Sequence, residues 1–269
     1  MFEIKDLDET RAPLLDHLIE LRTRIIRALL ALGVGFAVCF YFADEILGIL
    51  VQPLKDAFPE GEGRLIFTRL PEVFFVELKV ALFAGFMVSF PVIANQLWAF
   101  VAPGLYAREK KAFLPFLLAT PVLFGAGAAL AYFVVMPVAF TFFLGFGGTT
   151  GGLAVEALPS AGDYLGLVMQ FILAFGLTFL LPVLLLLLHR AGIVSRAQMV
   201  AARRYVIVVI FVIAAVVTPP DPGSQIVLAV PLWLLFEASL LLMRFQEKAV
   251  EADRAAREAE AAAEQVAAE

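Results

Sequence analysis

Charged side chains that could bind another charged molecule are concentrated in residues 16–24, which read DHLIELRTR. The apolar residues around them follow a 4, 3, 4 spacing, which predicts an amphipathic helix with His17, Glu20 and Arg24 on its polar side. Glu20 and Arg24 stand at i and i+4, the favourable order for a weak ion pair on a solvated helix face. The alternative is a carboxylate that receives a cation from another molecule. The pattern by itself leaves both interpretations open.

A second charged cluster, WAFVAPGLYAREKK, covers residues 98–111. Trp98 and Tyr106 suit a membrane–water interface, and three bases follow the rule that places Lys and Arg on the cytoplasmic side. Glu109 does not follow from that rule. This acid is either neutralised by the bases beside it or serves as a docking carboxylate.

The patterns of common hydrolases and nucleotide-binding proteins are absent. The two histidines, His17 and His189, have no metal-ligand spacing around them, and the single cysteine, Cys39, cannot form a disulfide within the chain. Neither a G-x-S-x-G motif nor a glycine-rich phosphate loop followed by lysine occurs. We therefore expect no enzymatic activity and no cofactor, and we expect membrane lipid rather than nucleic acid around the chain.

The elements that must position these residues are membrane-spanning helices. The 269 residues are 62% hydrophobic and 17% charged, far from the composition of soluble domains. About 20 apolar residues cross a bilayer, which predicts an all-α integral membrane protein with six spans. The spans lie near residues 25–43, 74–98, 113–143, 164–188, 205–217 and 226–243. Lys and Arg gather before the first span, between the even and odd spans and after the sixth, which predicts that both termini are cytoplasmic.

The predicted spans differ in length. The third is so long that it must tilt, kink at Pro121 or Pro137, or project from the bilayer. The apolar run of the fifth, residues 205–217, gives only about 20 Å of helix. Such short fifth and sixth spans either thin the membrane beside them or continue as polar helix. Both alternatives are open.

Polar residues inside the predicted spans include Gln170 and Glu237. A charge at a helix centre costs about 2.5–3.5 kcal/mol on insertion scales, so Glu237 needs a packing or a functional reason. Between the first two spans, apolar residues spaced for one helix face predict an interfacial helix over residues 46–54.

Several motifs in order resemble the TatC family of the twin-arginine protein translocase: HLIELRTR, QLWAFVAPGLYAREKK, AYFVVMPVAFTFF and VVTPPDPGSQ. The resemblance implies a cup-shaped six-helix receptor in the bacterial cytoplasmic membrane. It would recognise signal peptides with two adjacent arginines on folded cargo and move that cargo with the protonmotive force. Its partners would be the single-span subunits TatA and TatB and other copies of itself. A secondary transporter for a small solute is the alternative, favoured by convergent polar groups at mid-membrane.

The resemblance also implies roles for individual residues. By the match to the family motifs, the signal-binding surface falls on Glu20, Arg22, Phe100 and Glu109. Chemistry agrees with two carboxylates in this role, since arginine pairs with carboxylates through charge-assisted, often bidentate bonds. The residues that match family positions shaping a periplasmic cap are Pro53, Asp221 and Gln225.

One position departs from the family pattern. Many relatives carry a glutamate inside span four where this chain has Leu180, so a mechanism that needs an acid there is in doubt. Gln170 is about 15 Å of helix away and does not replace it. We expect residues 1–245 to form the membrane domain and residues 246–269 an Ala/Glu-rich cytoplasmic tail with high helix propensity and no essential function.

Overall fold

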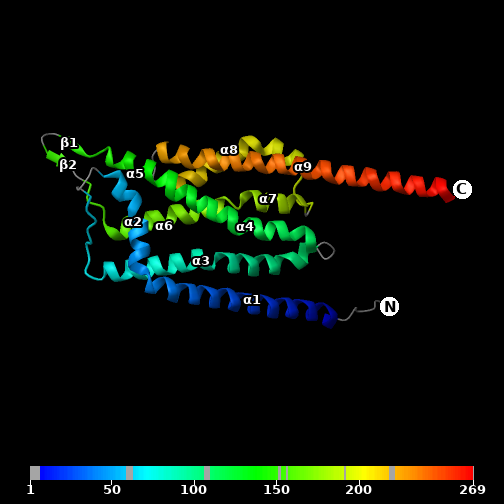
Figure 1. Cartoon of the computed structure of the whole chain (residues 1–269), viewed down its shortest axis with the longest axis horizontal. Coiled ribbons are helices and arrows are strands. Elements are labelled where there is room, and N and C mark those ends of the chain that lie inside the picture. The colour runs from blue at the N-terminus through cyan, green and yellow to red at the C-terminus, as the bar shows by residue number, and fades with distance from the viewer. Residues whose placement is uncertain are drawn as a thin grey trace. The chain divides into compact units, whose positions relative to one another are not determined.

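The computed structural model describes residues 7–58, 63–105, 110–150, 153–155, 157–190, 192–217 and 222–268. These residues are almost entirely helical (Figure 1). In chain order the helices are α1 (Leu7–Tyr41), α2 (Ala43–Ala57), α3 (Glu72–Leu105), α4 (Lys110–Leu130), the π-helical turn η1 (Ala131–Val135), α5 (Met136–Leu144), α6 (Ala161–Thr178), α7 (Leu181–Arg190), α8 (Arg196–Val217) and α9 (Pro222–Ala268). A short antiparallel hairpin, β1 (Gly148–Thr150) and β2 (Leu153–Val155), lies between α5 and α6.

Six stretches of the described residues are long and apolar enough to cross a membrane, which confirms the predicted number. They are His17–Tyr41, Glu72–Phe100, Phe116–Leu144, Ala161–Arg190, Arg196–Val216 and Gln225–Lys248. The fifth and sixth, with 21 and 24 residues, are the shortest of these six, as predicted. Since α8 begins at Arg196, the fifth span continues as polar helix before its apolar run. Membrane thinning stays a prediction.

The chain divides into two compact units, Met1–Gly176 and Leu177–Glu269. In the first unit, α1 packs along α3 at a crossing made of small residues. A Cβ on Gly35 would lie 2.7 Å from the carbonyl oxygen of Gly85, and the Ser89 hydroxyl donates to the Ala31 carbonyl at 2.8 Å. Small residues let membrane helices approach closely and bond across the contact.

The helix α2 confirms the helix predicted over residues 46–54, and Pro53 is buried within it. Proline has no N–H, so the carbonyl of Ile49 lacks its usual helical donor. The hydroxyl of Tyr132 in η1 donates to that carbonyl at 2.7 Å. The hydroxyl of Tyr164 in α6 donates to the next carbonyl, Leu50, also at 2.7 Å. Two tyrosines therefore hold α2 against the third and fourth spans.

The third span is irregular at the second of the two prolines that sequence analysis singled out. Pro121 lies within the continuous helix α4, whereas η1 ends two residues before Pro137. Pro137 cannot donate to the carbonyl four residues earlier, and the backbone accommodates this by widening one turn, so that Met136 N–H bonds to the Ala131 carbonyl.

The fourth span is also interrupted. The helix α6 ends at Thr178 and α7 begins at Leu181, with Phe179 and Leu180 in a turn between them. Pro182 stands in the first turn of α7, where a missing N–H is tolerated. Leu180, where sequence analysis expects a departure from the family pattern, therefore lies at a break in the helix.

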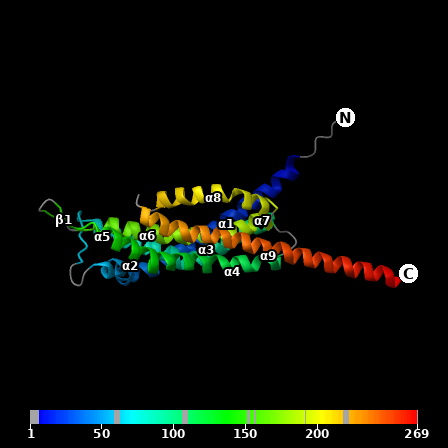
Figure 2. The same ribbon diagram turned by 90° about the horizontal axis from the view of Figure 1, so that it is seen from above.

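In the second unit, α8 and α9 run side by side in both views (Figures 1 and 2). The buried residues of these two helices include Ile210 and Ala214 on α8 and Leu228, Leu232 and Phe236 on α9. Apolar side chains at three- and four-residue spacing on α9 give it one continuous packing face.

Candidate functional site

The predicted ion pair between Glu20 and Arg24 is present on α1. Arg24 Nε donates to Glu20 Oε1 at 3.0 Å, and Arg24 Nη2 donates to the same oxygen. The Glu20 side chain is 35% exposed and that of Arg24 is 21% exposed. Each turn of the helix places residues i and i+4 on one face, so this contact follows from local spacing. The carboxylate is accessible and already holds one guanidinium.

Phe100 reaches this site through a contact that the sequence did not reveal. Its ring stacks on the His17 ring, with centroids 4.4 Å apart and an angle of 15° between the planes. His17 Nδ1 lies 3.9 Å from Glu20 Oε2. The structure therefore brings Phe100 of α3 beside Glu20 of α1, with His17 between them. The signal for His17 was its position three residues before Glu20 on the same helix face.

Of the other two residues of the predicted signal-binding surface, the structure describes only Arg22. Arg22 is exposed on α1, and residues two apart on a helix face different directions from Glu20. Glu109 lies outside the described residues, between α3 and α4. Those two helices are joined near this end by Trp98, whose indole N–H donates to the Thr120 hydroxyl at 2.7 Å.

Glu237 has a partner on the neighbouring helix of the second unit. Arg203 Nη2 of α8 donates to Glu237 Oε2 of α9 at 2.7 Å, and both side chains are partly exposed. This contact supplies a packing reason for an acid in an apolar helix. Arg203 precedes residues 205–217, the fifth span predicted from the sequence, because the hydropathy falls there although the helix continues. Gln170 is exposed on α6 of the first unit.

A second ion-pair cluster, formed around Glu247, joins the helices of the second unit. Glu247 of α9 accepts a hydrogen bond from Arg196 Nε of α8 at 2.7 Å and lies 3.6 Å from His189 Nε2 of α7. His189 Nδ1 in turn lies 3.1 Å from the Val194 carbonyl oxygen. Glu247 therefore links all three helices of the second unit, although it belongs to the segment that sequence analysis assigned to the tail.

In the first unit, a carboxylate at the start of α3, the end of that helix away from Phe100, joins two chain segments. Sequence analysis did not identify this residue, Glu72. Glu72 Oε2 accepts from the Thr68 and Arg69 backbone N–H groups at 2.7 and 3.2 Å. Glu72 Oε1 accepts from the Ser160 hydroxyl and the Gly162 N–H at 2.7 and 2.9 Å. One side chain thus joins the loop before α3 to the start of α6. The signal available in the sequence was a glutamate at the first turn of a helix, where it can bond to free N–H groups.

Of the predicted periplasmic cap residues, the structure describes Pro53 and Gln225. Pro53 is buried in α2 of the first unit, Gln225 is partly buried in the first turn of α9 in the second, and Asp221 lies outside the described residues.

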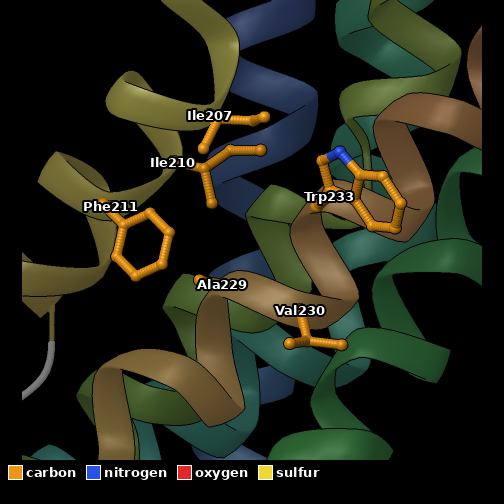
Figure 3. Close-up of a pocket in the computed structure, with 6 residues that line it drawn as sticks. All are labelled: Ile207, Ile210, Phe211, Ala229, Val230 and Trp233. Atoms are coloured by element: carbon orange, nitrogen blue, oxygen red, sulfur yellow. The ribbon is translucent and has the colours of Figure 1, made fainter. Parts of the chain in front are cut away.

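The second unit also has an apolar groove between α8 and α9 (Figure 3). Its volume is about 270 Å³. Ile207 and Ile210 point from α8 toward the α9 side, with Trp233 opposite. The full lining is Ile207, Ile210, Phe211, Ala229, Val230 and Trp233. Within a membrane, such a surface can contact lipid chains or an apolar helix.

These features define a multi-pass helical membrane protein with ion pairs on its helices. Residues 16–231 match the model of the Sec-independent protein translocase protein family (TatC). The TatC protein of Magnetococcus marinus is 48% identical over 95% of this chain and 93% of its own length. That of Escherichia coli K12 is 37% identical over 88% of this chain and 90% of its own length.

Solved structures agree with these similarities. A crystal structure of the twin arginine translocase receptor TatC superposes with a TM-score of 0.73 at 40% identity, covering 85% of this chain and 98% of that one. The chain belongs to the TatC family of Sec-independent protein translocase components, which are multi-pass membrane proteins of bacteria. The family resemblance drawn from the motifs is therefore confirmed, and protein transport replaces the alternative of a small-solute transporter.

Proposed function

We propose that this chain is the signal-peptide receptor and core scaffold of a twin-arginine translocase. It binds signal peptides with two adjacent arginines and moves folded cargo with the protonmotive force, without catalysing a reaction. The observation that carries the proposal is the accessible Glu20 carboxylate beside the His17–Phe100 stack. A solved relative, 40% identical, is described as a twin arginine translocase receptor.

The chemistry of the site suits an arginine side chain. A guanidinium offers parallel N–H donors to a carboxylate, and its flat face packs on aromatic rings, whereas lysine offers a single point charge. Glu20 supplies the carboxylate and the stacked rings of His17 and Phe100 supply a flat apolar surface next to it. We propose Glu109 as the acceptor for the second arginine, with Arg22 nearby on α1.

The proposed assembly follows from the spans and their charges. The excess of Lys and Arg before the first span and after the sixth supports cytoplasmic termini. With that orientation, Glu20 would face the side where signal peptides arrive. The apolar groove on α8 and α9 supports contact of the short fifth and sixth spans with the membrane helices of TatA and TatB. We propose that Pro53, Asp221 and Gln225 shape the periplasmic cap, that further copies of the chain complete the complex, and that residues 246–269 are a cytoplasmic tail.

Site-specific photocrosslinking in membranes tests the receptor function. A twin-arginine signal peptide carrying a photoreactive residue is expected to crosslink to the wild-type chain, and the crosslink should be lost in Glu20→Gln and Glu109→Gln. The glutamine variants keep side-chain volume and remove only the charge. A twin-lysine peptide serves as the control and should crosslink weakly. Equal crosslinking by all variants and both peptides would refute the proposed site.

A further inference from the structure

The Glu20 carboxylate is engaged by a guanidinium of its own chain. Arg24 places Nε 3.0 Å from Glu20 Oε1 and directs Nη2 to the same oxygen. This is the type of contact that an arginine of a signal peptide would make with the carboxylate. We infer that Arg24 is an internal stand-in for the signal-peptide arginine: it occupies Glu20 while the site is empty and releases it when a peptide binds. The inference rests on the function proposed above.

The geometry leaves a route for the exchange. Both donor atoms of Arg24 are directed to Oε1. Oε2 lies 3.9 Å from His17 Nδ1, which is longer than a hydrogen bond. An incoming guanidinium can therefore contact Oε2, next to the His17–Phe100 stack, while Arg24 still holds Oε1. The carboxylate never has to be left without a partner during the exchange.

The pair is of a kind that is readily broken. It joins residues one turn apart on one helix, and both side chains are partly exposed. Partly exposed ion pairs reduce the affinity of a competing ligand by roughly 1.5- to 5-fold. A peptide that takes over the whole carboxylate displaces Arg24 whether it carries arginine or lysine, so this reduction is common to both peptides. Arg24 therefore lowers the affinity of the receptor and keeps binding reversible without changing which peptide is preferred.

Whether removal of Arg24 raises or lowers the affinity for the signal peptide distinguishes a competing Arg24 from an Arg24 that orients Glu20. If Arg24 competes with the peptide, its removal raises the affinity. If Arg24 instead orients Glu20 for the peptide, its removal lowers the affinity. The test measures binding of a fluorescein-labelled twin-arginine signal peptide to the purified full-length chain in detergent, by fluorescence anisotropy.

Arg24→Gln is expected to bind this peptide about 1.5- to 5-fold more tightly than the wild type. Arg27→Gln is the matched control, because it removes the same charge from the exposed side of α1 and leaves the Glu20–Arg24 pair intact. Its affinity should not rise. The double variant Glu20→Gln with Arg24→Gln should bind the peptide no more tightly than Glu20→Gln alone, because without the Glu20 carboxylate Arg24 no longer competes with the peptide. In Arg24→Lys a single ammonium group replaces the guanidinium beside Glu20, so the rise in peptide affinity should be smaller. This variant provides a second test should Arg24→Gln not fold.

Three results would overturn the inference. A lower affinity of Arg24→Gln would make Arg24 a positioning residue. An equal rise in Arg27→Gln would assign the effect to overall charge. An unchanged affinity of Arg24→Gln, with binding still lost in Glu20→Gln, would refute the stand-in alone and leave the receptor function in place. Wild-type affinity in Glu20→Gln would instead refute the proposed binding site itself.

Discussion

The crossing of α1 and α3 makes a quantitative prediction about Gly35. A Cβ at this position would lie 2.7 Å from the Gly85 carbonyl oxygen, about 0.7 Å short of ordinary contact, which begins at 3.4 Å. Backbone cannot move aside as a side chain can, so the helices would separate. The same displacement would stretch the hydrogen bond from Ser89 to Ala31 from 2.8 Å to about 3.5 Å, where it is lost.

Gly35→Ala should therefore destabilise the chain by about 1–3 kcal/mol, the usual cost of overpacking a well-packed contact. For a chain of this size that corresponds to a fall in Tm of roughly 2–10 °C. Gly33→Ala is the matched control. It makes the same substitution on the same helix, and nothing lies within 4 Å of the added Cβ. Its Tm should stay unchanged or rise, because alanine favours helix over glycine.

Thermal unfolding of the purified chain in detergent, followed by circular dichroism or by a thiol-reactive dye at buried Cys39, measures both variants. A Tm for Gly35→Ala equal to that of Gly33→Ala would show that the helices do not approach as closely as described. The close approach would then not explain the small residues at this crossing.

Two further contacts make predictions. Tyr132→Phe should cost about 1–2 kcal/mol in unfolding free energy, because it leaves the Ile49 carbonyl without a donor. Pro53→Ala restores a backbone N–H for that carbonyl, so in this background Tyr132→Phe should be nearly neutral. A double-mutant cycle in which the two effects simply add would contradict this. Arg203→Gln should lower the yield of membrane-inserted protein and the Tm more than Glu237→Gln does, because Arg203→Gln leaves an unpaired carboxylate in an apolar helix. Quantitative immunoblotting measures the yield and thermal melts measure the Tm. A larger loss in Glu237→Gln than in Arg203→Gln would refute the pairing.

The spans and the Glu20–Arg24 pair could be predicted because both depend on local sequence. The hydrocarbon thickness demands a minimum apolar length, and i,i+4 spacing places two side chains on one helix face. The stack of His17 on Phe100 could not be predicted in this way, because it depends on how α1 and α3 pack. Hydropathy similarly left Arg203 outside the predicted fifth span, although the helix α8 continues through its polar turns.

The two proline positions of the third span show another limit of sequence analysis. Each proline removes one N–H, so each could have interrupted the helix. Only the backbone geometry shows that the turn before Pro137 widens while Pro121 is accommodated within α4. The hydrogen bond from Tyr132 in that widened turn to α2 joins residues 83 positions apart in the chain.

The helix α9 continues without interruption from the sixth span to Ala268. Twenty residues beyond Lys248 correspond to about 30 Å of helix. A continuous helix of that length acts as a lever: a tilt of about 10° in the sixth span would carry its far end about 5 Å sideways. Small rearrangements of the span within the bilayer are thereby amplified outside it, where a probe attached near the end of the chain could report them.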